Sequence, residues 1–143
     1  MDNSVPRLIR ESNKKIRTLV EETFRENGLD DVRPQEGRML WYIVEHPGTT
    51  SADICQHQCL AKSSVSESLA VLADKGFIEY LVNAENRREK VIVVTPLGAL
   101  RQKKVDKAFD SISEKLLDGL SQKEVEALQG GLRKIIENAE RRD

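Results

Sequence analysis

The chain has 143 residues, 38% of them hydrophobic, which is enough for one domain with a core of its own. Its 23 basic and 24 acidic residues leave a formal net charge of -1, which excludes a protein that coats nucleic acid through bulk charge. Any contact with nucleic acid must therefore come from a local basic patch.

The first third of the chain predicts two amphipathic helices. Residues 3–27 carry apolar side chains at steps of three, four and seven residues, and Gly28 is suited to end this helix. Pro34 is suited to open a second helix through the segment MLWYIVEH, which ends at Pro47–Gly48. The apolar positions of the first helix are Leu8, Ile9, Ile16, Leu19, Val20 and Phe24.

A short helix, a turn and a second helix are predicted next. Thr50 and Asp53 resemble a capping box, so a short helix should run from Ser51 to about His57. After the connection at residues 58–61, the following helix has one apolar stripe and ends at Gly76. The stripe is Val65, Leu69, Leu72 and Ala73, and the residues expected to be exposed are Ser63, Ser64, Ser66, Glu67 and Ala70.

A β-hairpin follows this helix. Apolar residues at Phe77, Ile78 and Leu81 predict one strand, and the β-branched run VIVVT at residues 91–95 predicts another. The segment NAEN between them is typical of a turn, so the strands should pair with each other. The basic residues close to the tip of the hairpin are Arg87, Arg88 and Lys90.

Two long helices complete the chain. Thr95–Pro96 is suited to begin the first, and Ser121 with Glu124 forms a capping box for the last. Gly130–Gly131 interrupts the last helix, and each glycine lowers helix stability by roughly 1 kcal/mol relative to alanine. The pair either permits a kink or a close backbone approach, or is a weak spot in the helix. The apolar stripes are Val105, Phe109, Ile112 and Leu116 in the first helix and Val125, Leu128, Leu132, Ile135, Ile136 and Ala139 in the second.

This order of elements predicts a mainly α fold with a small β-hairpin, the winged form of helix-turn-helix. The apolar stripes at the two ends exceed what a winged module of ~65 residues can cover, and a second copy is the best partner for them. We therefore expect a homodimer. Its predicted interface residues are Ile9, Ile16, Val125, Leu128, Leu132 and Ile136.

Two ordered motifs connect this chain with a known family. Apolar positions that lead into Lys-Gly-apolar-Ile occur at Val65, Leu69, Leu72, Lys75, Gly76, Phe77 and Ile78. A wing pattern follows, which is an aspartate, a basic residue and an arginine, then alternating apolar residues and Leu-Thr-x-x-Gly. It is matched by Asn86, Arg87, Arg88, Val94, Thr95 and Gly98. In this order and spacing, over nearly the whole chain, the residues resemble those of the MarR family of bacterial transcription regulators.

The resemblance implies a homodimeric winged-helix regulator, most often a repressor, that binds a palindromic operator in double-stranded DNA. It implies a single domain of residues 1–143, with a winged helix-turn-helix part at 30–97 and dimerisation helices at 1–29 and 98–143. It also implies a small aromatic or anionic effector in the cleft between these parts. Trp41 and Tyr42 are candidates to line that cleft, although aromatic residues at helical spacing also suit a core.

Three positions depart from the family pattern, and each removes positive charge or its support. Asn86 replaces the usual aspartate that helps to hold the wing arginine, and Glu67 stands where many members have an arginine. Tyr80 occupies a common arginine position in the first wing strand. These departures favour an alternative function, a winged-helix protein-interaction module with weak or lost operator binding.

The helix and the wing are expected to act differently on DNA. Hydroxyls and free amides at the start of the helix can meet phosphates or bases in the major groove, while Glu67 either accepts from a cytosine amino group or repels phosphate. The wing arginines can reach phosphates or a narrow minor groove, although arginines at a hairpin tip also protect sheet edges. The predicted DNA-binding residues are Lys62, Ser63, Ser64, Ser66, Glu67, Arg87, Arg88 and Lys90.

No pattern predicts an enzyme, a cofactor or a metal site. In the segment CQHQC, helical residues two apart point about 200° apart, so His57 would face away from Cys55 and Cys59. The chain has no glycine-rich phosphate loop and no Gly-x-Ser-x-Gly turn. A redox role of the two cysteines stays open.

The sequence predicts a cytoplasmic protein that does not enter a membrane. Its first residues, MDNSVPRLIRESNKK, lack the apolar run of a signal peptide. No apolar stretch approaches the ~20 residues that a membrane-spanning helix needs. Two cysteines in a chain of this length do not make a disulfide framework.

Overall fold

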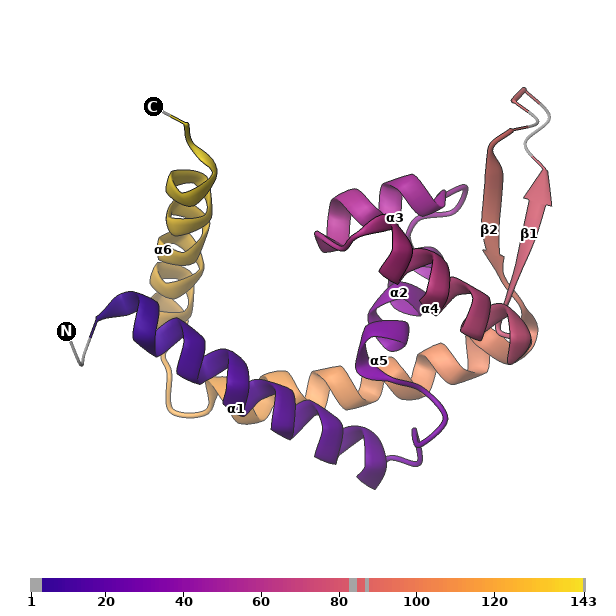
Figure 1. Cartoon of the computed structure of the whole chain (residues 1–143). Coiled ribbons are helices and arrows are strands. Elements are labelled where there is room, and N and C mark those ends of the chain that lie inside the picture. The colour runs from indigo at the N-terminus through magenta and orange to yellow at the C-terminus, as the bar shows by residue number, and fades with distance from the viewer. Residues whose placement is uncertain (1–3, 83–84, 87, 143) are drawn as a thin grey trace. The chain divides into compact units, whose positions relative to one another are not determined.

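The computed structural model describes residues 4–82, 85–86 and 88–142 (Figure 1). The chain forms two compact units, Met1–Asp110 and Ser111–Asp143. Within the described ranges, no helix has the length and apolar content needed to cross a membrane. The elements are α1 (Val5–Glu26), α2 (Pro34–Glu45), α3 (Ser51–Gln58), α4 (Lys62–Asp74), β1 (Ile78–Val82), β2 (Lys90–Val94), α5 (Pro96–Leu117) and α6 (Gln122–Glu140).

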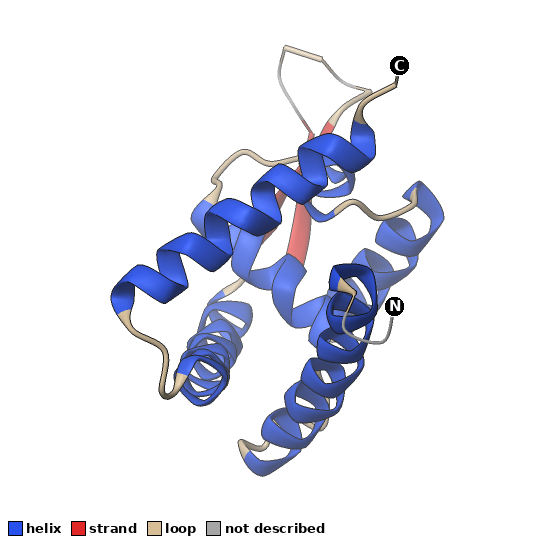
Figure 2. Cartoon of the chain, turned by 90° about the vertical axis from the view of Figure 1, so that its left-hand side faces the viewer, coloured by secondary structure: helices blue, strands red, loops and turns tan. Residues whose placement is uncertain are grey.

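Helices dominate the chain, and the two strands form its one sheet among the described residues (Figure 2). The predicted fold class, mainly α with a small β-hairpin, is confirmed. β1 and β2 pair antiparallel, from Ile78 opposite Val94 to Val82 opposite Lys90. The backbone N–H of Ile92 also donates to the Thr49 carbonyl at 3.0 Å, which anchors the hairpin to the loop before α3.

Local sequence signals start and end the helices as predicted. The Thr50 hydroxyl accepts from the Asp53 N–H at 3.3 Å, and the Asp53 carboxylate accepts from the Thr50 N–H at 3.1 Å. Ser121 and Glu124 make the same reciprocal pair before α6, so both predicted capping boxes are confirmed. After α1, Gly28 has a φ of 70°, a left-handed conformation that glycine adopts without steric penalty.

The second strand lies one residue earlier than predicted, because Thr95 serves the next helix. Its Oγ1 accepts from the Gly98 N–H at 3.0 Å and so caps the first turn of α5. The same hydroxyl donates to the Gly76 carbonyl at 2.6 Å. A Cβ on Gly98 would lie 2.0 Å from the Phe77 carbonyl oxygen, so this close approach requires glycine.

The core of the first unit lies where α2, α3, α4 and the hairpin meet. α4 packs against α2, α3 and β1, and α2 also packs against β2. The predicted apolar stripe of α4 faces inward, since Val65, Leu69 and Leu72 are 1% exposed or less. The other fully buried side chains of these elements are Met39, Leu40, Ile54, Ile78 and Ile92.

The second unit presents an uncovered apolar face on α6. None of the residues of this helix is buried. Leu128 and Ile136 are 49% and 56% exposed, and Leu132 and Ile135 are both 38% exposed. Helix α6 runs through Gly130 and Gly131 without interruption, and a Cβ on either would meet no atom within 4 Å. Within the described chain, the two glycines therefore serve no close backbone approach.

The predicted interface residues outside this face comprise one exposed residue and two half-buried ones. Ile9 on α1 is 37% exposed, Ile16 is half-buried, and Val125 on α6 is half-buried. Further exposed apolar residues on α1 are Val5 and Leu8, whereas Val20 and Phe24 near its other end are buried. Helix α1 thus enters the core of its unit only through its last turns.

Candidate nucleic-acid interface

The first two turns of α4 carry the predicted DNA-binding residues of this helix. Lys62 is its first residue, and Lys62, Ser63, Ser66 and Glu67 are exposed. The N-cap residue, Ala61, has no side chain that could accept from the first-turn amides, so these N–H groups stay available to an anion.

Ser64 differs from the exposed position predicted for it, because it is half-buried. The flank of α4 that carries Ser64 and Ser68 faces α2, and there the Gln35 side-chain amide donates to the Ser68 hydroxyl at 3.1 Å. The expected exposure was therefore wrong for Ser64, and the accessible hydroxyls of the helix are those of Ser63 and Ser66.

The turn of the wing is ordered by Asn86. Its side-chain carbonyl accepts from the Arg88 backbone N–H at 3.2 Å, and its backbone carbonyl accepts from the Glu89 N–H at 3.0 Å. The side chain of Asn86 thus holds the backbone of Arg88. Arg88 is exposed at this turn. Arg87 lies outside the described residues.

Lys90 is exposed at the start of β2, on the side of the hairpin that carries Tyr80. Its ammonium lies 5.9 Å from the centroid of the Tyr80 ring. Partial burial raises the pKa of Tyr80 above its ordinary value, so the phenol stays neutral and adds no negative charge beside the lysine. The wing therefore presents at least two cations, on Arg88 and Lys90.

A groove of about 800 Å³ runs between the start of α3, α4 and the hairpin. It brings together Ser66 from α4, Arg88 and Lys90 from the wing, and Ser51 from α3. The hydroxyl residues at the start of α3 were not among the predicted site residues, although the capping box had already indicated that they begin a helix. Two carboxylates, those of Asp53 and Glu89, also line the groove and limit its positive charge.

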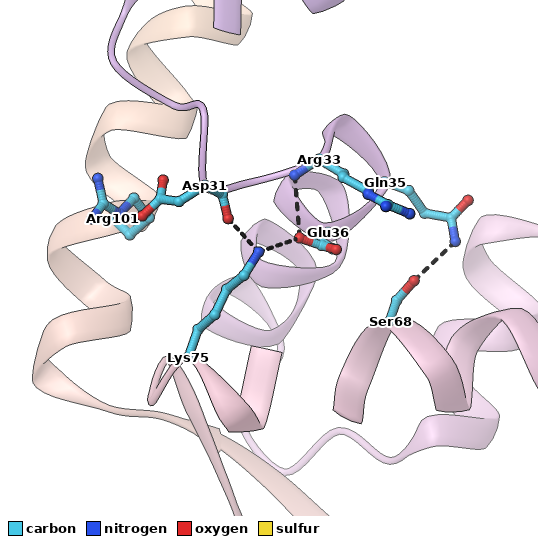
Figure 3. A network of polar contacts seen from close by, with 7 residues as sticks. All are labelled: Asp31, Arg33, Gln35, Glu36, Ser68, Lys75 and Arg101. Carbon is cyan, nitrogen blue, oxygen red and sulfur yellow. Dashed lines mark hydrogen bonds and ion pairs between the residues drawn. The ribbon is translucent and has the colours of Figure 1, made fainter. Parts of the chain in front are cut away.

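A polar network holds the far end of α4 in place (Figure 3). The Lys75 ammonium, at the C-cap of α4, lies 3.1 Å from the Glu36 carboxylate and also donates to the Asp31 carbonyl. The Glu36 side chain is only 4% exposed, and it accepts from the Arg33 N–H at 3.2 Å as well. Helix α4 is thereby joined to the first turn of α2.

The network continues to α5. The Asp31 carboxylate pairs with the Arg101 guanidinium at 3.0 Å (Figure 3). This guanidinium also lies 5.5 Å from the centroid of the Phe77 ring. Sequence reasoning missed these contacts, because their partners are far apart in the chain and carry no shared local motif.

Only one of the two predicted effector residues lines a cleft. Trp41 lines a cleft of about 460 Å³ together with Arg38, His57 and Phe109. Tyr42 is only 9% exposed and does not line this cleft. Its ring centroid lies 4.0 Å from that of His46 and 4.4 Å from that of His57, so Tyr42 belongs to the core.

A second cleft, of about 810 Å³, lies between α1 and α2. Four arginines line it, against two acidic residues, Glu21 and Asp30. Burial and the neighbouring charge of Arg17 lower the pKa of Arg38, which lines both clefts. The four are Arg17, Arg25, Arg33 and Arg38. A bound anion would relieve this concentration of positive charge.

The cysteine and histidine segment takes a different geometry from a metal site. Cys59 ends α3 in a left-handed conformation with a φ of 53° and is exposed, while Cys55 is half-buried. The His57 ring packs on Tyr42. Across residues 4–82, 85–86 and 88–142, no three His, Cys, Asp or Glu side chains are arranged to hold a metal ion.

Comparison with known families supports this description. A model of the MarR family matches residues 30–89, which run from the loop before α2 to the turn of the wing. No protein with a curated function matches the sequence.

Solved structures extend the likeness to nearly the whole chain. The S. aureus MepR–DNA complex is 23% identical, with a TM-score of 0.86 over 96% of this chain and 97% of that chain. A mutant E. coli MarR with operator DNA is 23% identical, with a TM-score of 0.82 over 94% of this chain and 96% of that one. Bordetella bronchiseptica BpsR is 16% identical, with a TM-score of 0.85 over 94% of each chain. At these low sequence identities, the structural matches establish a shared fold and nothing more.

Proposed function

Residues 30–89 form a winged helix-turn-helix of the MarR family, and from this premise we propose that the chain is a homodimeric, sequence-specific DNA-binding transcription regulator. We propose further that it acts as a repressor and that a small molecule modulates its DNA binding. Structures with this fold include MepR bound to DNA and MarR bound to operator DNA. DNA binding by BpsR is regulated by 6-hydroxynicotinic acid.

The observation that carries the proposal is the groove between α4 and the wing. A recognition helix enters the major groove with its N-terminal turns, which here hold Ser63, Ser66 and uncapped amides. The DNA strand that borders the major groove then passes between α4 and the hairpin. Arg88 and Lys90 lie there, where they can neutralise its phosphates.

The exposed face of α6 supports a symmetric complex. A second copy that covers Leu128, Leu132 and Ile136 would place two winged units around one axis. The operator should then be approximately palindromic, with half-sites about 10 base pairs apart from centre to centre.

A second function is favoured by a different observation. Apart from Lys62, the exposed side of α4 carries no cation and has two acids, Glu67 and Asp74. Such a surface suits a winged-helix protein-interaction module with weak or lost operator binding. A protein that binds no DNA at low salt, where electrostatic binding is strongest, would favour this module.

The wing provides the test of DNA binding. We expect Arg88→Ala to weaken binding to operator and to random DNA alike, because phosphate contacts carry no sequence information. The slope of log K against log salt should fall by about 0.9 for the lost contact. Titrations at several salt concentrations measure both effects. An unchanged slope and affinity would remove Arg88 from the interface.

Two further variants sharpen this measurement. Lys104→Ala removes an exposed cation from α5 and should leave the slope unchanged. Asn86→Asp keeps the acceptor for the Arg88 N–H and adds a negative charge beside the phosphates. We therefore expect it to weaken binding. Tighter binding by Asn86→Asp would mean instead that a poorly held wing arginine limits the affinity.

The arginine-lined cleft between α1 and α2 supports the proposed effector. An aromatic carboxylate would bring an anion to Arg17 and Arg38 and an apolar ring to Val20 and Phe24. Benzoate at about ten times its Kd should stabilise the wild type by about 1.4 kcal/mol. Thermal unfolding should show this as a raised Tm, with a much smaller rise for Arg38→Met and for neutral benzamide. Equal rises in all three would refute an anion site at Arg38.

A further inference from the structure

The outward ridge of α4, which we define as Ser63, Glu67, Ala70 and Asp74, follows steps of four, three and four residues. It therefore lies on one line along the helix, opposite the buried Val65, Leu69 and Leu72. All four ridge residues are exposed. In a winged helix-turn-helix on DNA, this ridge faces the floor of the major groove.

Glu67 occupies the ridge without a counter-charge. The residues three and four positions away on the helix are Ser63, Ser64, Ala70 and Val71, so no basic side chain can reach it along α4. Among the described residues, the Glu67 carboxylate takes part in neither an ion pair nor a hydrogen bond. Its carboxylate is thus free to accept hydrogen bonds from a bound molecule.

A carboxylate in the major groove can be matched by few base edges. It only accepts hydrogen bonds, and guanine presents two acceptors there, N7 and O6. Thymine presents the O4 acceptor and a methyl group, and adenine places its N6 donor beside the N7 acceptor. Cytosine presents the N4 amino group without an adjacent acceptor on its own edge. Against any other base, the carboxylate would lose its water without a full replacement.

We propose that Glu67 is a specificity-determining residue that accepts a hydrogen bond from the N4 amino group of a cytosine in each operator half-site. The inference rests on the proposed function, DNA binding through α4. The other residues of the ridge and its flank are less able to select one base than Glu67. Ser63 and Ser66 both donate and accept and so discriminate weakly, and Ala70 offers only a methyl group, which suits thymine.

Selection from randomised DNA duplexes tests this role. The wild-type protein should recover sites with cytosine at one fixed position of each half-site, and another base there should lower the affinity about tenfold. Glu67→Gln should shift the preference at that position to adenine, because an amide pairs with N6 and N7. Glu67→Arg should shift it to guanine, through O6 and N7.

The control is Glu22→Gln, which makes the same charge change on the exposed surface of α1, outside residues 30–89. It should leave the selected sequence unaltered. Since Glu67 is exposed and unpaired, its variants should keep the thermal stability of the wild type, which excludes misfolding as the cause of a shift.

Two outcomes would overturn the proposal in distinguishable ways. If Glu67→Gln binds all sequences more tightly and keeps the wild-type base preference, the carboxylate merely repels phosphate and reads no base. If the wild-type protein recovers no sequence even at low salt, then DNA binding itself fails, and the role of Glu67 fails with it.

Discussion

Replacing Leu128 and Leu132 together by aspartate should yield monomers or insoluble protein. The two leucines lie one turn apart on the apolar face of α6, and they are 49% and 38% exposed. Burying each against a second copy would contribute on the order of 1 kcal/mol, given that part of each side chain is already covered. Two carboxylates in the same place would be buried without partners, which is far more unfavourable. Sedimentation velocity measures the outcome directly.

The matched control is Leu128→Met with Leu132→Met, which keeps the apolar surface and should stay dimeric. The aspartate variant should also lose affinity for a palindromic operator by roughly 10²-fold or more, because a monomer binds only one half-site at a time. A dimer that is as stable with both aspartates as without them would rule out this face of α6 as the interface.

Local signals in the sequence predicted most of the secondary structure. The capping boxes at Thr50 and Ser121, and the glycine after α1, act within one helical turn, so a single sequence is enough to recognise them. The predicted second strand ended one residue too late, because Thr95 caps the next helix through its hydrogen bonds with Gly76 and Gly98. β-propensity alone does not reveal that a residue is used as a helix cap.

The candidate site was less predictable, because long-range packing decides it. The burial of Ser64 depends on α2, which lies against one flank of α4. The different positions of Trp41 and Tyr42, which are adjacent on α2, are also set by packing: Trp41 lines a cleft, whereas Tyr42 is buried against His46 and His57. No sequence pattern indicated the pairing of Lys75 with Glu36, which are 39 residues apart.

The residues of the proposed DNA interface divide into two groups, which should affect affinity and base preference differently. Arg88 and Lys90 carry positive charge on the wing, where the proposed phosphate contacts would set the affinity for DNA and its dependence on salt. Glu67 adds no attraction to phosphate, so any benefit from it must come from a base edge. Substitutions in the wing should therefore change affinity for all DNA, while substitutions at Glu67 should change which DNA is preferred.

Lys75→Met should be among the most destabilising single substitutions near the recognition helix. It leaves the Glu36 carboxylate, 4% exposed, without its cation while the methionine keeps the packing of the lysine stem. Breaking a buried pair by removing one partner costs about 3–5 kcal/mol. Because the Lys75 side chain is 31% exposed and water can reach this side of the pair, we expect a loss near the lower end, about 3 kcal/mol. Urea unfolding measures it, with an unchanged m-value.

The double variant Lys75→Met with Glu36→Gln separates the uncompensated charge from the loss of the contact. Glutamine keeps an acceptor for the Arg33 N–H and removes the buried charge, so the double variant should recover much of the stability lost by Lys75→Met alone. If the single and double variants are equally unstable, the Glu36 charge is solvated in the folded state. The destabilisation would then come from the lost contacts of the Lys75 ammonium with Glu36 and with the Asp31 carbonyl, which join α4 to α2, and not from an unpaired buried charge.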